Sequence, residues 1–306
     1  MVFQQANTGR IALAGFFFAV ILDSCNPTSP AGLGNCPVGT SDERLTSGGQ
    51  TRQYEIFVPA SYRTGKAFPL VIGFHGQGGS ASQFESYSGF STLASQAGFI
   101  AVYPQGAGQI SSWDTWAGSQ DVQFIRDLTA TVEAQCAVDR NRIYAVGHSR
   151  GGGMVNRLAC DLSDRIAAVG SVSGTYQFGE DCSPGRPVAI VAFHGTDDSD
   201  VPYNGIGIAD AMPDPYFSIG TPVPQWATAW GERNGCDARP AAIFQQGTVT
   251  GQGWKNCRGG ANVILYTING GGHEWPNAVD AARMIWNFFV RHPLAEGESD
   301  RVLLIL

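Results

Sequence analysis

A serine set between closely spaced glycines is the first feature of this sequence that could perform chemistry. The segment Gly147-His148-Ser149-Arg150-Gly151 follows a short apolar run and precedes a stretch of helical character. A strand, a sharp turn and a helix around G-x-S-x-G form a nucleophile elbow, which exposes the serine hydroxyl beside a helix N-terminus. We therefore expect Ser149 to be a nucleophile; the alternative is a glycine-rich turn without chemical function.

A serine hydroxyl is a weak nucleophile until a base takes its proton, and histidine titrates nearest to neutrality. The chain has five histidines. His148 adjoins Ser149, and we expect the turn to point its side chain elsewhere. His273 lies in a glycine-rich loop late in the chain, where the order Ser…Asp/Glu…His of α/β-hydrolases requires the base. The remaining three are expected to hold loops or to follow the last helix: His75, His194 and His292.

The acid that orients the base should lie between the serine and the histidine, just after a strand. The segment His194–Pro202 ends a strand and contains three aspartates, Asp197, Asp198 and Asp200. Their spacing alone does not choose among them.

Backbone N–H groups must also stabilise the oxyanion that forms during acyl transfer. The N–H that follows the nucleophile belongs to Arg150. A second N–H should come from the loop after an early strand, His75–Ser80, where we favour Gln77 over Gly76. The alternative is that this loop is a glycine-rich turn needed only for chain reversal.

Strand-like and helix-like segments alternate around these residues. Short apolar runs and alternating patterns predict strands over 52–59, 69–74, 99–103, 143–146, 167–172, 187–193 and 263–268. Apolar positions spaced near 3.6 residues predict helices over 120–136, from the elbow to Leu158, and over 278–290. This alternation predicts an α/β fold with a mostly parallel sheet and helices on both faces. Ligands gather at the carboxyl ends of such strands.

The composition is that of a folded, weakly charged protein. Of 306 residues, 43% are hydrophobic and only 15% are charged, against about 25% in typical domains. The net charge of −7 and the few basic residues exclude the footprint that nucleic-acid binding requires. No second apolar stretch is long enough to span a membrane.

The N-terminus resembles an export signal. Arg10 precedes the apolar run 11–22, which is too short for a membrane span but suits a secretory signal. The segment before Cys25 resembles a lipoprotein processing site except at Asp23, which leaves lipid attachment at Cys25 open beside an ordinary cleaved signal peptide. We therefore expect a signal peptide over 1–25, a flexible segment over 26–50, a catalytic domain over 51–293 and a tail over 294–306.

Export favours disulfides for the six cysteines that remain after Cys25. The pairs Cys160–Cys182 and Cys236–Cys257 each close a moderate loop, which leaves Cys36–Cys136. The alternative is that some of the six are free, buried thiols. No C-x-x-C pair supports a zinc site, and we expect neither a metal nor a cofactor.

Four motifs together resemble the secreted polyhydroxybutyrate depolymerase-like esterases, a group similar to carbohydrate esterase family one, which includes feruloyl and acetylxylan esterases. The motifs, which span about residues 50–291, are F-H-G-x-G-G-S from Phe74, G-H-S-x-G-G from Gly147, H-G-T-x-D-x-x-V-P-Y from His194 and G-G-G-H-x-W-P from Gly270. The resemblance implies an α/β-hydrolase fold and assigns the acid to Asp198, which leaves Asp197 and Asp200 as solvated loop charges. Arg150 departs from the smaller or amide residues often found after the nucleophile.

The resemblance implies a secreted serine esterase that acts on small or polymeric ester substrates, and we expect the protein to be a monomer. Feruloyl or acetyl esters of plant polysaccharides and hydroxyalkanoate polyesters both remain candidates. Trp113, Trp116 and Trp275 follow strands, and we expect their rings to contact substrate; the alternative is ordinary packing. A peptidase on the same fold, or a binding protein on a catalytically dead hydrolase fold, are the other functions considered.

Overall fold

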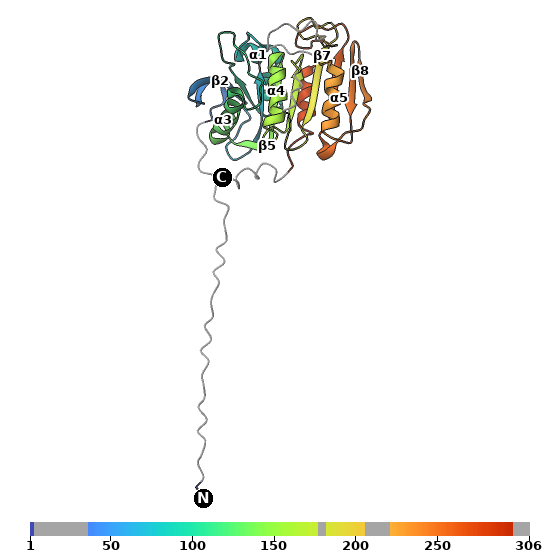
Figure 1. Cartoon of the computed structure of the whole chain (residues 1–306). Coiled ribbons are helices and arrows are strands. Elements are labelled where there is room, and N and C mark those ends of the chain that lie inside the picture. Colours follow the sequence, from blue (N-terminus) through green and yellow to red (C-terminus); the bar gives the residue numbers. More distant parts are fainter. Residues whose placement is uncertain (3–35, 177–181, 206–220, 296–306) are drawn as a thin grey trace. The chain divides into compact units, whose positions relative to one another are not determined.

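The computed structural model describes residues 1–2, 36–176, 182–205 and 221–295, and all of its elements lie in the unit that begins at Leu33. Ten strands form one sheet in the order β1-β2-β4-β3-β5-β6-β7-β10-β9-β8 (Figure 1). The strands are β1 (Gly39–Ser47), β2 (Gln50–Val58), β3 (Phe68–Phe74), β4 (Ile100–Pro104), β5 (Val138–His148), β6 (Ala168–Val172), β7 (Ala189–Gly195), β8 (Ala241–Gln246), β9 (Val249–Trp254) and β10 (Val263–Ile268).

The central strands, from β4 through β10 in sheet order, run parallel. Every residue of β3, β4, β6 and β7 is buried, because helices cover both faces and each side chain meets a packed layer. Antiparallel strands complete the sheet at both edges. The carboxyl ends of the parallel strands therefore point to one edge of the sheet, where the functional loops meet.

Two apolar clusters form the core, one on each face of the sheet. The helices are α1 (Ala81–Ser88), α2 (Phe90–Ala97), α3 (Gln120–Gln135), α4 (Arg150–Asp161), α5 (Val223–Arg233) and α6 (Ala281–Phe289). α3, α4 and α5 pack into one cluster, and α1, α2 and α6 into the other. In Figure 1, α4 and α5 lie in front of the strands. This is the predicted α/β-hydrolase architecture.

α3 illustrates how the sequence pattern produces this packing. The predicted apolar positions Val122, Ile125, Leu128 and Val132 are each at most 5% exposed. Burial of a side chain of this size contributes about 1.5–3 kcal/mol. Ser119 caps the helix, accepting a hydrogen bond from the Val122 N–H at 3.2 Å. The 3.6-residue period was therefore a sufficient signal for this helix.

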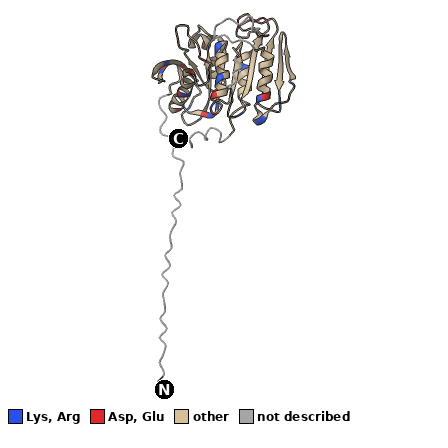
Figure 2. Cartoon of the chain, viewed as in Figure 1, with Lys and Arg blue, Asp and Glu red and all other residues tan. Residues whose placement is uncertain are grey.

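Charged residues are few, and Figure 2 shows basic and acidic positions interspersed along the helices. One acidic side chain on α3, Glu133, pairs with Arg140 and Arg165, each at 3.0 Å. Within the described ranges, no helix is long and apolar enough to cross a membrane.

Three disulfides join the six cysteines as predicted: Cys36–Cys136, Cys160–Cys182 and Cys236–Cys257. The alternative of free thiols is wrong for these six. The first bond closes a loop with a sequence separation of 100 and ties the chain before β1 to the end of α3. Loss of one such bond costs a small domain about 2–5 kcal/mol.

The structure corrects two of the expected boundaries. Residues 39–47, inside the segment expected to be flexible, form β1, which pairs with β2 along its whole length from Gly39 to Ser47. The domain also extends past 293, because Leu294 is buried and its N–H donates to the Asn141 carbonyl at 2.8 Å. The predicted signal peptide apart from residues 1–2, the Cys25 site and residues 296–306 of the tail lie outside the described residues.

Candidate active site

Ser149 occupies a strained turn between β5 and α4. Its backbone adopts φ 55° and ψ −121°, a left-handed conformation that costs a non-glycine residue energy and is typical of a nucleophile elbow. The Ser149 N–H donates to the Val172 carbonyl at 2.9 Å, and its carbonyl accepts from the N–H groups of Gly153 and Thr175. These three bonds fix the serine at the carboxyl edge of the sheet.

The two glycines of the motif are required by close backbone approach. A Cβ on Gly147 would collide with the carbonyl of Gly151, and a Cβ on Gly151 would collide with the carbonyl of Phe74. Without side chains, the turn can fold tightly against the neighbouring strand β3. The G-x-S-x-G spacing thus has a packing cause at both of its glycines.

Ser149, His273 and Asp198 lie in one continuous line of hydrogen bonds. The Ser149 hydroxyl donates to His273 Nε2 at 2.8 Å. The opposite ring nitrogen, Nδ1, donates to the carboxylate of Asp198 at 2.9 and 3.0 Å. The three residues come from the ends of β5, β10 and β7, so the parallel sheet brings together positions that are up to 124 residues apart.

Asp198 is held as an anion in a buried environment. Its side chain has no exposed surface, and it accepts from the Val201 N–H at 2.7 Å and contacts His194 Nε2 at 3.3 Å. Burial alone would raise the pKa of Asp198, but the hydrogen bonds from His194, His273 and Val201 outweigh burial and hold this pKa below its usual value. An ionised carboxylate of this kind can stabilise an imidazolium.

The other two aspartates do not meet the base. Asp197 is exposed and accepts from the Thr196 hydroxyl at 3.0 Å. Asp200 lies at the edge of the pocket, and its N–H donates to Asp198 Oδ1 at 3.0 Å. Of the three candidates, the structure brings only Asp198 to His273.

A cavity of about 510 Å³ opens over Ser149. The loop after β3 forms one wall, and a Cβ at Gly76 would lie only 3.2 Å from Ser149 Cβ. The N–H groups of Gly78 and Gly79 are occupied by carbonyls of Ser111 and Gly76. Among the described residues, the N–H of Gln77 has no partner, and Gln77 and Arg150 both line the cavity.

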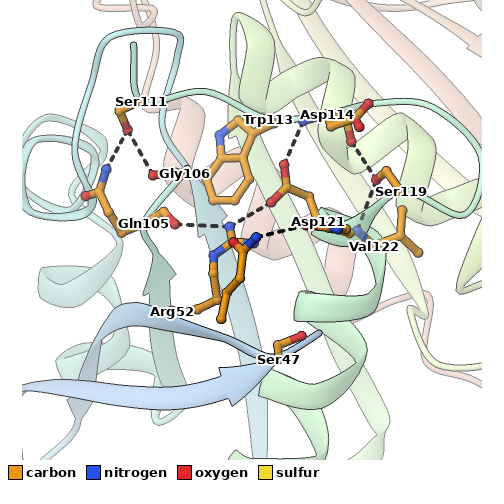
Figure 3. Close-up of polar contacts among 12 residues, drawn as sticks. Ser47, Arg52, Gln105, Gly106, Ser111, Trp113, Asp114, Ser119, Asp121 and Val122 are labelled. Atoms are coloured by element: carbon orange, nitrogen blue, oxygen red, sulfur yellow. Dashed lines mark hydrogen bonds and ion pairs between the residues drawn. The ribbon is translucent and has the colours of Figure 1, made fainter. Parts of the chain in front are cut away.

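A second loop, residues 105–114, supports this wall, and Figure 3 shows polar contacts of that loop, including those of Gln105, Ser111 and Asp114. The Trp113 indole N–H donates to the His75 carbonyl at 2.8 Å. The Gly106 N–H donates to His75 Nε2 at 2.9 Å, and His75 Nδ1 donates to the Gly76 carbonyl at 2.7 Å. Both ring nitrogens of His75 are thereby engaged, and burial lowers the pKa of His75, which keeps its ring neutral.

A buried ion pair anchors the supporting loop in turn. Arg52 on β2 meets Asp121 on α3 at 2.6 Å, with both side chains 7% exposed. The second oxygen of Asp121 accepts from the Asp114 N–H at 2.7 Å, and Arg52 also contacts the Gln105 carbonyl at 3.4 Å (Figure 3). The pair therefore holds both ends of the 105–114 loop.

Arg150 connects α4 to the same supporting loop. The residue is 4% exposed, and its Nε donates to the Trp113 carbonyl at 3.0 Å. The Arg150 guanidinium thus helps to fix the loop behind His75.

The three predicted substrate tryptophans lie in different environments, and the prediction for Trp113 is contradicted. Trp113 is only 2% exposed and packs against Phe74 and His75 at ring distances of 5.1 and 5.0 Å, so its ring is core and not a substrate surface. Trp116 is 46% exposed but does not line the cavity over Ser149. Trp275 packs behind the cavity wall, 6.0 Å from Tyr87.

Two side chains of α1 and one beside the serine form parts of the cavity that sequence reasoning missed. Gln83 and Tyr87 are four residues apart, so they share a helix face, and both line the cavity. His148 also lines it, although the turn was expected to point this residue away; its Nε2 donates to the His273 carbonyl at 2.9 Å. The polar sequence of α1 has only a sparse apolar period, and no local pattern predicts the contact of His148 with the His273 carbonyl.

No group of three or more His, Cys, Asp or Glu side chains with the geometry of a metal site occurs within the described ranges. The cavity residues are donors and acceptors suited to acyl transfer: a hydroxyl, an imidazole with a carboxylate behind it, and main-chain N–H groups.

The sequence matches the family described as esterase PHB depolymerase over residues 52–203. It is 35% identical to feruloyl esterase B of Piromyces equi over 78% of this chain and 44% of that protein, so the chain spans less than half the length of this relative. It is 26% identical to feruloyl esterase D of Neurospora crassa over 90% of this chain and 96% of that protein.

Solved structures with the same fold include an acetyl xylan esterase from Aspergillus awamori, with a TM-score of 0.62, 16% identity and coverage of 82% of this chain and 99% of that one. A ferulic acid esterase from Anaeromyces mucronatus gives a TM-score of 0.51 at 18% identity and covers 83% and 90%. At these identities the structural likeness shows the fold alone. By these sequence matches, the chain is similar to the polyhydroxybutyrate depolymerase-like esterases and to feruloyl esterases.

Proposed function

We propose that this chain is a secreted serine esterase that hydrolyses carboxylic esters through an acyl-enzyme on Ser149. The observation that carries the proposal is the line from Ser149 Oγ to His273 Nε2 to Asp198, at 2.8 and 2.9 Å, beneath an open cavity. Nucleophile, base and orienting acid within hydrogen-bond reach are the geometry that acyl transfer requires.

In the first half-reaction, the Ser149 hydroxyl transfers its proton to His273 Nε2 while Oγ attacks the ester carbonyl. The N–H groups of Gln77 and Arg150 hold the oxyanion, and Asp198 stabilises the imidazolium. Collapse of the tetrahedral intermediate breaks the bond to the alcohol oxygen, which takes the proton from His273. The acyl group remains on Ser149.

In the second half-reaction, His273 takes a proton from water, and the hydroxide oxygen attacks the acyl-enzyme. The same N–H groups hold the second oxyanion. When the bond to Oγ breaks, Ser149 recovers its proton from His273, and the carboxylic acid leaves. Each proton and each bond is accounted for by the ester, water and these residues.

For the substrate, we propose feruloyl or acetyl esters of plant polysaccharides. The similarity to the esterase PHB depolymerase family and to two feruloyl esterases supports this class. In the cavity, Tyr87 is 42% exposed and offers an aromatic surface, and Gln83 adds an amide one helical turn earlier. Hydroxyalkanoate polyesters are the second class, which a substrate panel of methyl ferulate, acetylated xylan and polyhydroxybutyrate separates.

For the location, we propose export to an oxidising compartment. Three disulfides within the described residues support it, because such bonds persist mainly outside the cytosol. Peptide mass spectrometry of the exported protein tests the accompanying expectations: cleavage near residue 25, and either a free or a lipid-modified Cys25.

Pre-steady-state hydrolysis of p-nitrophenyl acetate tests the mechanism. We expect a burst of nitrophenol as the acyl-enzyme forms, and Ser149→Ala should abolish the burst and lower kcat on the order of 10⁶-fold. Ser95→Ala is the matched control, because this serine lies on α2 and its hydroxyl bonds only within its helix, to the Ser91 carbonyl. A Ser149→Ala variant with wild-type turnover would disprove the proposed nucleophile, and binding without turnover by the wild type would favour a non-catalytic binding protein.

A further inference from the structure

The loop that carries His273 begins with three consecutive glycines, Gly270–Gly272. Glycine loses more backbone freedom on ordering than any other residue, so such a loop needs tethers to hold one conformation. Its start is tethered to the end of β7: the Gly270 N–H donates to the Thr196 hydroxyl at 2.8 Å, and the Gly271 carbonyl accepts from the Asp197 N–H at 2.9 Å. These bonds lie before the base and leave its own main chain to be held otherwise.

The main chain of His273 is held from the opposite side, by His148. Among the described residues, the hydrogen bond made to it is that from His148 Nε2 to the His273 carbonyl, at 2.9 Å. A carbonyl oxygen only accepts, so Nε2 carries the hydrogen. His148 Nδ1 is then the acceptor, and it faces the Tyr87 hydroxyl at 3.4 Å. Both nitrogens of the ring are engaged, and neither is directed at Ser149.

His148 is itself firmly placed. It ends β5 and immediately precedes Ser149, whose backbone is fixed by the strained turn and by its bond to Val172. The His148 ring packs edge-on against Tyr87 and Trp275, at 5.8 and 6.5 Å. The rigid elbow is therefore joined to the glycine-rich loop through one imidazole.

We propose that His148 is a positioning residue for the esterase reaction: it holds the main chain of His273 so that the base meets the Ser149 hydroxyl. The proposal rests on the proposed function, because it assigns His273 the role of base. His148 does not touch the ester in this scheme. It sets the separation between Ser149 Oγ and His273 Nε2, now 2.8 Å, on which proton transfer depends.

The ring keeps the protonation state that this role needs. Burial, followed by the neighbouring His273, lowers the pKa of His148 to about 4. At neutral pH the ring is therefore uncharged, retains its acceptor at Nδ1 and places no positive charge beside the base.

Two substitutions of His148 separate the hydrogen bond from the packing. His148→Leu fills similar space without a donor, whereas the amide N–H of His148→Gln can still reach a carbonyl. We expect His148→Leu to lower kcat about 100-fold with KM nearly unchanged, since a displacement of the catalytic base by about 1 Å can cost that much. We expect the kcat of His148→Gln to lie within about tenfold of wild type, because this variant keeps a hydrogen bond to the His273 carbonyl.

The same two substitutions at His292 are the matched control. His292 also donates to a main-chain carbonyl, that of Phe288 at 2.7 Å, but it follows α6 and does not line the cavity. Its variants should keep wild-type kcat and KM. Melting temperatures of all four variants show whether any loss of turnover reflects unfolding.

The proposal is overturned if folded His148→Leu turns over within twofold of wild type, or if folded His148→Gln is as impaired as His148→Leu. A fall confined to KM would also overturn it, because that would assign His148 to substrate binding. These results leave the proposed function standing, because the wild type would still show its burst. A wild type without a burst would instead refute the proposed function and this inference with it.

Discussion

The two loops that face Ser149 are held in different ways. The loop proposed to supply the oxyanion hole, residues 75–79 (the oxyanion loop), is bonded to Gly106, Ser111 and Trp113 of a supporting loop that is itself fixed by a buried ion pair. The base loop, residues 269–276, has three glycines before its histidine, and the main chain of that histidine is bonded by His148. The first loop is thus held by several bonds from another loop, whereas the tethers of the second loop lie before His273 and leave the main chain of that residue with the bond from His148.

This difference predicts how each loop responds to the loss of a single hydrogen bond. Where several bonds share the support of a segment, loss of one shifts it little, because the others still define its position. Where a segment has few bonded main-chain groups, its local stability is low and a single loss can displace it. Substitutions near the base loop should therefore reduce turnover, whereas those behind the oxyanion loop should mainly reduce stability.

The largest effect should come from the carboxylate that orients the base. Asp198→Asn removes the anion bonded to His273 Nδ1 and allows the wrong tautomer, so we expect kcat to fall about 10⁴-fold. Steady-state hydrolysis of p-nitrophenyl acetate measures it. Asp197→Asn, which alters an exposed neighbour without contact to the base, should stay near wild type; equal losses in the two variants would refute the assignment of Asp198.

An intermediate effect should appear in the pH dependence of stability. His148 has an ordinary pKa of 6.5 when unfolded and about 4 when folded, so the unfolded chain binds the proton first as the pH falls. Its contribution is complete above pH 6.5 and is lost between about pH 6.5 and pH 4, by about 3 kcal/mol in total.

Urea unfolding of the wild type and of His148→Gln from pH 7.5 to pH 4 measures this contribution. Both proteins retain the buried His75 and His292, whose lowered pKa values act in the same direction, so the difference between the two curves isolates His148. The variant should lose less stability over this range than the wild type. Parallel curves would contradict a neutral, buried His148.

The smallest effect on turnover should come from substitutions in the loop that supports the oxyanion loop. Trp113→Phe leaves the His75 carbonyl without the indole N–H, which should lower the free energy of unfolding by about 1–3 kcal/mol. The bonds to Gly106 and Ser111 remain, so we expect kcat to fall by no more than about tenfold, equivalent to about 1.4 kcal/mol in the barrier. Chemical denaturation and the ester assay measure the two quantities.

Trp116→Phe is the control for Trp113→Phe, because Trp116 is 46% exposed and its removal should change stability by less than about 0.5 kcal/mol. A Trp113→Phe variant that stays stable but loses most of its turnover would contradict the difference between the two loops. It would show that the position of the oxyanion loop depends on a single hydrogen bond.

Long elements with a clear period were predictable from the sequence, and weakly patterned ones were not. The apolar strands β3 and β4 and the helix α3 carried their own signals. α1 has a polar sequence in which only Ala81, Phe84 and Ser88 are buried, so its period was too sparse to identify. β8 is mostly exposed, and β9 contains two glycines, so neither alternates cleanly. α5 could have been found, because Trp226 and Trp230 are four residues apart after a proline.

The sequence by itself determined which chemistry is available. Residue types and chain order selected Ser149 and His273. The glycines around Ser149 indicated a tight turn between a strand and a helix. Local spacing also limited the acid to three aspartates within four residues. These properties are local, because backbone strain, period and residue type act over a few positions.

Only the tertiary structure decided which groups meet. That Trp113 is buried and that His148 bonds to the carbonyl of His273 depend on strand order, which brings residues 125 apart into contact. No pattern around residue 148 or 113 encodes the loop that will lie over it. Burial and long-range hydrogen bonding are set only when the sheet brings distant segments around each side chain. Those contacts distinguish the imidazole of His273, which is bonded to Ser149 and Asp198, from that of His148, which is bonded to the His273 carbonyl.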